Sequence, residues 1–513
     1  MSLHLDKKSI IKKTLQVGAA TFLSRSIAIA REILQIKFFG VGALSDAFIV
    51  AFRIPNLFRH VFAEGALSAS FIPVFVKAIK EGKREEAQGL MTALCGLIQT
   101  FIFAMYAVVL LKADWVVACM APGFSPEQSA YTQLFLKILF PFLAFVSASA
   151  LLGGALNAVN HFFVPALGPA LWNMTYVMSL VLCLWLKLTP TYLCVGVLLG
   201  GIVQFCMNMF MYRRKNLSFS AITASSKNLF KQVMTKFFPC LLGVSILEIN
   251  LIVSGIVASF LPKGSVSILY YASRFMNIPL GVFGVALSNI LLPHFSRVVL
   301  YAPKRFNFYL LEVAKLVTWV IVPVALVLSF VSEQLFSMIF FLAKKISVEQ
   351  IVQARWILVI YSVGLVFFCF NKILLSLFYS LKDTRSTTIA SGVGAAINGI
   401  GDVISLYYGN IYGIAASAVL AGLGSSLISC YFLWKRHGVH FYLSRYARFF
   451  SSFFMQLISC STMFLIVFYS ITYLVSFSSG FAYWIVVAIC SATTAIVWYL
   501  SRSFFKVHLY FLR

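Results

Sequence analysis

The sequence predicts an all-α integral membrane protein with about 14 transmembrane helices, arranged as two parallel-related six-helix lobes plus two C-terminal helices. Three observations support this prediction: an apolar composition, the distribution of cations between successive loops, and a motif that recurs along the chain. The 513 residues are 61% hydrophobic and 11% charged, whereas soluble domains average about 45–50% apolar and about 25% charged residues. The apolar runs leave no segment long enough for a separate soluble domain.

The apolar runs predict the individual spans, because about 20 apolar residues are needed to cross a bilayer as a helix. The second, eighth and tenth runs are long and contain Pro55, Pro279 and the polar pair Asn371 and Lys372. The approximate limits of the fourteen spans are 15–40, 45–76, 87–111, 130–158, 163–186, 190–212, 235–261, 266–296, 308–331, 352–380, 385–408, 411–434, 449–474 and 480–501.

The loop cations test this count independently, since Lys and Arg are enriched in cytoplasmic loops. With both termini cytoplasmic and alternating loops, 26 of the 41 cations fall on the cytoplasmic side and 5 fall on the outer side. The remaining 10 lie within predicted spans. A miscounted span would reverse every later loop and abolish this bias, so the distribution favours fourteen spans with both termini inside.

The net charge of +26 is therefore explained by loop cations that orient the protein in the membrane and contact anionic lipid headgroups. It does not indicate nucleic-acid binding. The ten cysteines show no paired or CxxC spacing and lie mostly in apolar runs, where Cys behaves as a small hydrophobic residue. We expect neither disulfides nor a metal site.

A ten-residue pattern recurs after 220 residues and predicts an internal repeat. Residues 66–75 read ALSASFIPVF and residues 286–295 read ALSNILLPHF, and Arg53 with Pro55 precedes the first copy as Arg274 with Pro279 precedes the second. An offset of six spans preserves orientation, so the repeat is parallel. Parallel repeats around a central cavity are typical of transporters, with the site at the repeat interface.

Charged residues inside predicted spans indicate the functional site. Each charge near the bilayer centre costs about 2.5–3.5 kcal/mol on insertion scales, so such residues face protein, water or a ligand. The predicted substrate-binding cations are Arg25, Arg31, Arg53, Arg59 and Arg274, and the acidic gate or ion-pair candidates are Glu32, Asp46, Glu64 and Glu248.

The arginines outnumber the acids, and this excess predicts an anionic ligand. Asp46, Arg53 and Glu64 fall within about 20° of one another on an ideal helix, whereas Arg31 lies off the face that Arg25 and Glu32 share. Guanidinium groups bind phosphate through two hydrogen bonds at once. A structural network of ion pairs is the alternative for Glu32, Asp46 and Glu64.

Motifs of several enzyme classes are missing, which argues against catalysis. The sequence contains no GxxxxGK[ST], GxSxG or HExxH motif and no zinc-ligand spacing. We predict no enzyme activity and no cofactor.

The chain resembles the MurJ (MviN) family of lipid II flippases, which belong to the MOP transporter superfamily. The matching stretches are 24–75, APGF at 121–124, LNAVNHFFVPALGPALWN at 156–173, residues 258–293, YSVGL at 361–365 and FYSLKDTR at 378–385. The resemblance implies a monomeric flippase of the bacterial cytoplasmic membrane. Its partner would be lipid II, the undecaprenyl-pyrophosphate-linked peptidoglycan precursor, which it would move from the cytoplasmic to the outer leaflet.

The resemblance also implies roles for parts of the chain. The cavity arginines of the family fall on Arg25, Arg31, Arg59 and Arg274, which would bind the pyrophosphate and the sugar-peptide head, and an acidic gate position falls on Asp46. The implied parts are an N-lobe (1–214), a cytoplasmic amphipathic connector (215–234), a C-lobe (235–440), and a C-terminal region (441–513) whose last two spans form a groove for the lipid tail.

The sequence departs from the family near Arg274. An acid common three residues after this arginine is Asn277, and one common just before it is Ser273. The seventh span, where the family often has Gln, contains Glu248. Our hypothesis is that Glu248 replaces the missing carboxylate as a gate or partner of Arg274, and we expect Asn277 to take part in gating.

Energy coupling and two rival functions stay open in the sequence. Moving an anionic head out of a negative cell interior gains about 2.3 kcal/mol per charge per 100 mV, and coupling to Na⁺ or H⁺ is an alternative. The rivals are an O-antigen type polysaccharide-precursor flippase and a cation-coupled drug exporter, although an exporter of cations would favour acids in its cavity. A non-transporting membrane scaffold would not need a charged interior.

Overall fold

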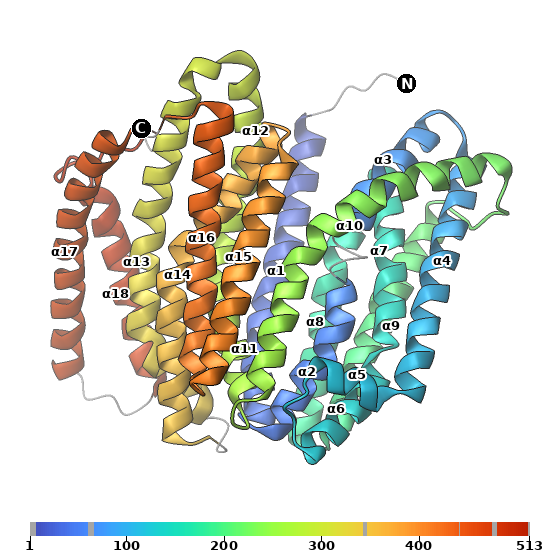
Figure 1. The fold of residues 1–513 in the computed structure, drawn as a ribbon, viewed down its shortest axis with the longest axis horizontal. Helices are drawn as coiled ribbons and strands as arrows, with labels where there is room; N and C mark the ends of the chain where they lie inside the picture. Colours follow the sequence, from blue (N-terminus) through green and yellow to red (C-terminus); the bar gives the residue numbers. More distant parts are fainter. Residues whose placement is uncertain (1–6, 60–65, 342–345, 441, 475–479, 511–513) are drawn as a thin grey trace. The chain divides into compact units, whose positions relative to one another are not determined.

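The computed structural model consists of α-helices joined by short loops (Figure 1). It describes residues 7–59, 66–341, 346–440, 442–474 and 480–510, and no β-strand occurs within these ranges. The chain divides into two compact units. Unit 1 comprises Met1–Tyr270, Ile339–Ser347 and Leu406–Ile411, and unit 2 comprises Tyr271–Met338, Val348–Ser405 and Tyr412–Arg513.

Unit 1 is a bundle built around buried aromatic side chains. In it α1 packs along α8, α9 packs on both α7 and α8, α2 packs on α6, and α10 packs on α3 and α4. Phe48, Phe71, Phe135 and Phe142 are almost fully buried in its core. Its helices are α1 (Lys7–Phe39), α2 (Ala43–Arg59), α3 (Ala66–Lys80), α4 (Arg84–Leu111), α5 (Ala113–Met120), α6 (Pro126–Leu139), α7 (Phe142–Ala158), α8 (Phe163–Trp185), α9 (Pro190–Arg214) and α10 (Ala224–Ser259).

Unit 2 begins within α11 (Ser265–Pro279) and includes the two C-terminal helices. Its α12 packs on α14, and α17 packs on α18. The Gln456 side chain joins three helices: it accepts a hydrogen bond from Trp319 Nε1 at 3.1 Å and donates one to the Trp498 carbonyl oxygen at 2.6 Å. The further elements are a π-helical turn (Leu280–Val285), α12 (Ala286–Tyr301), α13 (Phe306–Phe341), α14 (Val348–Ser380), α15 (Thr384–Tyr407), α16 (Ile411–His437), α17 (Leu443–Leu474) and α18 (Gly480–Ser501).

Ten helices in the described residues are long and apolar enough to cross a membrane. They coincide with ten of the fourteen predicted spans. The other four predicted spans correspond to α1, to α2 with α3, to α10 and to α18, each of which includes or adjoins residues that the structure does not describe in full. The all-α, multi-pass architecture is therefore confirmed, while the count of fourteen stays a prediction.

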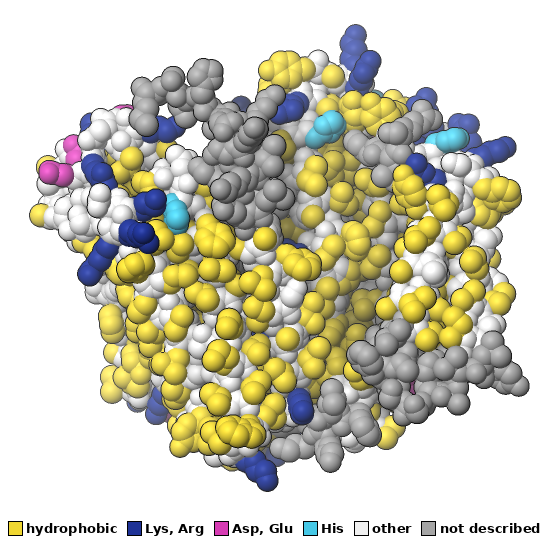
Figure 2. All heavy atoms as spheres, turned by 180° about the vertical axis from the view of Figure 1, so that it is seen from behind, with side chains coloured by type: hydrophobic (Ala, Val, Ile, Leu, Met, Phe, Trp, Pro, Cys, Tyr) yellow, Lys and Arg dark blue, Asp and Glu magenta, His cyan; other side chains and the backbone are white. Residues whose placement is uncertain are grey.

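Segments predicted to lie at or near the same side of the membrane are joined by hydrogen bonds within each unit. In unit 1, Arg84 donates hydrogen bonds to the carbonyl oxygens of Lys215 and Asn216 at 3.0 and 2.8 Å. In unit 2, the Tyr510 backbone N–H donates to Glu312 Oε2 at 2.9 Å. Figure 2 shows hydrophobic side chains over most of this face, with Lys and Arg mainly toward its upper part and a few near its lower edge.

Three pairs of helix caps support the internal repeat. Asn160 and Lys382, Lys187 and Gly409, and Asn216 and Gly438 all have positive φ, and the members of each pair are 222 residues apart. Each residue follows a helix C-terminus, where a left-handed residue is a common cap. The two sequence copies also occupy equivalent places, because α3 begins at the first residue of one copy and α12 begins at the first residue of the other.

The two long spans that contain proline differ at that residue: α2 continues past Pro55, whereas α11 ends at Pro279. Helix α2 continues through Pro55 and ends at Arg59. Helix α11 includes Pro279, and the following six residues form the π-helical turn before α12 begins. Single π-helical turns are rare and occur often at functional sites.

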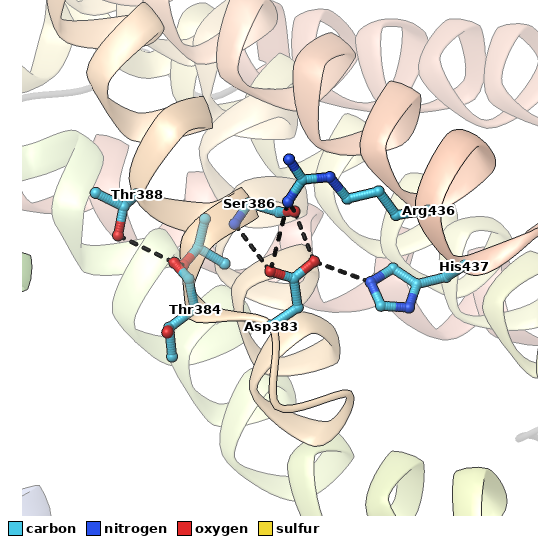
Figure 3. A network of polar contacts seen from close by, with 7 residues as sticks. Asp383, Thr384, Ser386, Thr388, Arg436 and His437 are labelled. Atoms are coloured by element: carbon cyan, nitrogen blue, oxygen red, sulfur yellow. Dashed lines mark hydrogen bonds and ion pairs between the residues drawn. The ribbon is translucent and has the colours of Figure 1, made fainter.

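A polar network joins α15 to the C-terminal end of α16 in unit 2 (Figure 3). Asp383 lies just before α15, where its Oδ1 accepts the backbone N–H of Ser386 at 3.0 Å, and its Oδ2 lies 3.0 Å from His437 Nε2. Arg436 Nη1 lies 4.0 Å from the same carboxylate. Burial raises the pKa of Asp383, but hydrogen bonds from Ser386 and His437 outweigh this effect and bring the pKa to about 2.

We expect Asp383→Asn to destabilise the protein in a pH-dependent manner. Because the folded pKa is below the ordinary value of 3.8, the carboxylate stabilises the fold above about pH 4, and this contribution disappears as the pH falls toward 2. The difference in thermal unfolding midpoint between wild type and Asp383→Asn should therefore shrink over that range. The exposed Glu349→Gln variant controls for the general removal of an acid, and a pH-independent difference would contradict the assignment.

Candidate functional site

Arg31 and Glu32 are buried together in unit 1, between α1 and α8. Arg31 Nη1 donates to Asn173 Oδ1 at 2.8 Å, and Nη2 forms an ion pair with Glu32. The guanidinium also lies 5.0 Å from the ring centroid of Trp172 and 5.4 Å from that of Tyr176. Helix α8 thus supplies an amide and two aromatic faces that hold this cation, and neighbouring positions on α1 form the ion pair.

Asp46 caps the start of α11 from the first turn of α2. Its carboxylate accepts the backbone N–H of Gly264 at 2.6 Å and that of Ser267 at 2.8 Å. Gln128 Nε2 of α6 lies 3.5 Å from the same carboxylate. Asp46 is 1% exposed, and a carboxylate at a helix N-terminus satisfies N–H groups that otherwise lack partners. The residue therefore ties α2 to the beginning of α11 within unit 1.

Arg53 lies about half a turn beyond the middle of α2 and contacts the backbone of α10. A Cβ atom added to Gly255 would overlap Nη1 of Arg53. The glycine is buried and helical, so the missing side chain creates the space in which the guanidinium lies against the helix. Glycine at a close approach of this kind has a packing reason.

Arg59 ends α2 and lines a cavity of about 200 Å³ within unit 1. Its Nε donates to Asn56 Oδ1 at 3.1 Å. The cavity lies between residues of α2, α3, α7, α8 and α9, and Asn157, Gln204 and Asn208 belong to its polar lining. Of the five predicted substrate-binding arginines, Arg59 is thus the one that lines this cavity in unit 1.

The remaining predicted residues are placed as follows. Arg25 of α1 is exposed, Arg274 of α11 is half-buried, and Asn277 of the same helix is exposed. Glu64 lies outside the described residues, and Glu248 belongs to α10 but its side chain is not described. Of the three charges in the predicted stripe, Asp46 and Arg53 both lie on α2, and the common face of the three stays a prediction.

Sequence reasoning missed several partners that position these charges. Trp172, Asn173, Tyr176 and Gln128 were not predicted as site residues. Trp172 and Asn173 end the stretch LNAVNHFFVPALGPALWN, which was the available signal. Which helix faces α1 depends on packing, and linear spacing does not encode it.

Unit 2 contains an apolar cavity of about 640 Å³ lined by α11, the π-helical turn, α13, α17 and α18. Its lining is almost entirely aliphatic and aromatic, with Ser461, Ser491 and Thr494 as hydroxyl groups. The Trp319 and Trp498 rings stack at 5.6 Å between centroids, and Trp498 also lines the cavity. Such a surface suits a hydrocarbon chain.

A second polar cluster in unit 2 joins α15 to α16. Asn398 Nδ2 donates to Asp402 Oδ2 at 2.9 Å, and Ser417 of α16 contacts both residues. Among the described residues, no group of three or more His, Cys, Asp or Glu side chains has the arrangement of a metal site. The charged groups of unit 1 thus suit an anionic, hydrogen-bonding ligand, and the cavity of unit 2 suits an apolar one.

Comparisons with known proteins agree on one family. The family model described as lipid II flippase MurJ matches residues 36–490. The probable lipid II flippase MurJ of Buchnera aphidicola subsp. Schizaphis graminum is 31% identical, with 85% of each chain covered. The lipid II flippase MurJ of Burkholderia cenocepacia is 30% identical, with 82% of each chain covered.

Solved structures share the fold. A lipid II flippase MurJ in an inward closed conformation matches with a TM-score of 0.78 at 24% identity, covering 96% of this chain and 99% of that one. An inward-facing multidrug resistance MATE family transporter of the MOP superfamily matches with a TM-score of 0.68 at 13% identity, covering 82% of this chain and 98% of that one.

We expect Asp46→Ala to lower the stability of the protein by about 1–3 kcal/mol, because two buried N–H groups at the start of α11 would lose their acceptor. The measurement is the thermal unfolding midpoint of the purified protein. Glu127→Ala is the matched control: Glu127 also reaches the segment before α11, through Lys263 at 3.6 Å, but both side chains are more than half exposed. Equal midpoints for the two variants would contradict the capping role.

Proposed function

The chain belongs to the lipid II flippase MurJ family, and we propose that the charged groups of unit 1 bind the head of lipid II while the apolar cavity of unit 2 holds its tail. As a member of this family the protein is a lipid II transporter of the inner membrane and not an enzyme. Lipid II is the membrane-linked precursor of peptidoglycan, so the protein serves cell-wall synthesis.

The observation that carries this proposal is the pairing of two unlike environments in one chain. In unit 1, Arg53 and Arg59 occupy positions next to a helix backbone and a polar cavity. In unit 2, an apolar cavity lies against the two C-terminal helices. Lipid II has a polar head, made of a pyrophosphate and a sugar-peptide, and a long undecaprenyl tail. The head requires charged and hydrogen-bonding groups, whereas the tail requires an apolar surface.

We propose fourteen spans in two six-span lobes plus two C-terminal spans, with both termini cytoplasmic. The paired helix caps 222 residues apart support the repeat, and the loop cations support the orientation. Helix α10 packs on α3 and α4, so the compact units divide after this helix, whereas the proposed repeat boundary at 215–234 includes the first residues of α10. A repeat unit and a packing unit need not have the same limits.

The proposed transport is alternating access by a monomer, with export of the anionic head favoured by the membrane potential. Arg25, Arg31, Arg53, Arg59 and Arg274 would neutralise the head group. Asp46 is proposed as the gate residue of the first lobe, and its hydrogen bonds to the start of α11 support this role. A polysaccharide-precursor flippase is the rival with the most similar substrate, since it also carries undecaprenyl-pyrophosphate sugars.

Rescue of cells depleted of their own lipid II flippase tests the proposed function. Expression of the wild-type chain should restore growth and normal cell shape, and Arg25→Ala should fail to do so at equal expression. A parallel strain depleted of an O-antigen precursor flippase tests the rival. Rescue of the second strain alone, or full activity of Arg25→Ala, would overturn the proposal.

We expect Gly255→Ala to reduce rescue by displacing the Arg53 guanidinium from the backbone of α10. The new methyl group would occupy the position of Nη1, and losing one charge-assisted contact of about 1.5–3 kcal/mol corresponds to roughly a tenfold or greater loss of transport rate. Gly392→Ala is the matched control, because a Cβ there would meet open space. Equal growth with the two variants would show that the position of Arg53 is not important.

A further inference from the structure

A groove on the surface of α9 in unit 1 joins apolar side chains to two arginines. Its volume is about 400 Å³. The six side chains that line it all belong to α9, and they are Phe205, Cys206, Met209, Phe210, Arg213 and Arg214. None of them lines the polar cavity that Arg59 borders, so the groove is a separate feature of unit 1.

The apolar part of the groove is exposed on a helix that is long and apolar enough to cross a membrane. Phe210 is 63% exposed, and the ring of Phe205 packs edge-on against Phe145 of α7 at 5.9 Å between centroids. Nine residues of helix separate Phe205 from Arg214, which corresponds to about 14 Å along the axis. This length is close to half of the hydrocarbon core of about 30 Å, so the groove suits the acyl chains of one leaflet.

The two arginines form the polar end of the groove, and both are exposed. Basic side chains near a helix C-terminus often bond to its last carbonyl groups. At the end of α9, Arg84 of α4 does this instead, because it donates to the carbonyl oxygens of Lys215 and Asn216 at 3.0 and 2.8 Å. Within the described ranges, neither Arg213 nor Arg214 forms an ion pair or a side-chain hydrogen bond. Two guanidinium groups are therefore available to a ligand.

The position of these arginines at the end of a span indicates the ligand class. In the proposed orientation this end of α9 is cytoplasmic, and the cytoplasmic leaflet contains anionic lipids that attract cations beside a span. Guanidinium groups bind a phosphate through two hydrogen bonds at once. A free phosphate would leave the apolar wall unused, and the ammonium group of a zwitterionic lipid would be repelled by the second arginine.

We propose that the groove on α9 binds an anionic phospholipid of the cytoplasmic leaflet. Its phosphate lies between Arg213 and Arg214, and its acyl chains lie along Phe210 and Phe205. The site goes beyond the proposed function, because its ligand is a resident membrane lipid and not the lipid that is transported. The inference uses the proposed orientation of the spans, but it does not depend on the identity of the transported lipid.

Native mass spectrometry of the purified full-length protein tests the site, because it resolves successive lipid-binding steps. The probes are phosphatidylglycerol and phosphatidylcholine with the same acyl chains. The double variant Arg213→Gln with Arg214→Gln should weaken the tightest phosphatidylglycerol step about 25-fold, since each cation beside an anionic head group contributes about fivefold. Phosphatidylcholine binding should stay unchanged, and an unchanged thermal unfolding midpoint confirms that the variant folds.

Lys227→Gln with Lys231→Gln is the matched control, because both lysines are exposed near the start of α10 and do not line the groove. It removes the same charge and should bind phosphatidylglycerol as the wild type does. An equal loss in the two double variants would replace the site by a diffuse effect of net charge. An equal loss of both lipids, or no loss in the arginine variant, would also overturn the proposal. Displacement of phosphatidylglycerol by glycerol 3-phosphate would show that the arginines bind free phosphate without the groove.

Discussion

The cost of charge in hydrocarbon is the constraint on which the structure of unit 1 depends. Helices α1 and α2 carry arginines and acids through an apolar environment, where unsatisfied charge is expensive. In unit 1, nearby protein groups offset this cost. Glu32, Asn173 and two aromatic rings surround Arg31, and a glycine opens the backbone of α10 to Arg53. The helices around α1 and α2 are arranged to solvate these side chains with protein groups.

The same constraint gives the charged residues different surroundings. Arg31 lies beside Glu32, Asn173 and two aromatic rings, and the Asp46 carboxylate accepts hydrogen bonds at the start of α11. Arg59, by contrast, lines a cavity together with polar side chains of α7 and α9. Arginines that look equivalent in the sequence thus differ in burial and in hydrogen-bond partners.

Irregular helical backbone lies next to predicted functional residues in unit 2. The π-helical turn follows the segment of Arg274 and Asn277. In lipid, irregular backbone is tolerated where protein or a polar cavity satisfies the freed groups. This turn therefore coincides with a part of the chain that the sequence marked as polar.

The sequence by itself determined the class of protein and the run of apolar helices, and it predicted the repeat, because hydropathy, loop charge and motif spacing are local or periodic properties. It identified Arg31, Asp46 and Arg59 as costly residues, since a charge in an apolar run is visible without a structure. Only the tertiary structure decided their partners. Asp46 meets Gly264 and Ser267 more than 200 positions away, and such pairing depends on which helix faces which. The cavity beside Arg59 depends on helix packing in the same way, because residues from five helices form its walls.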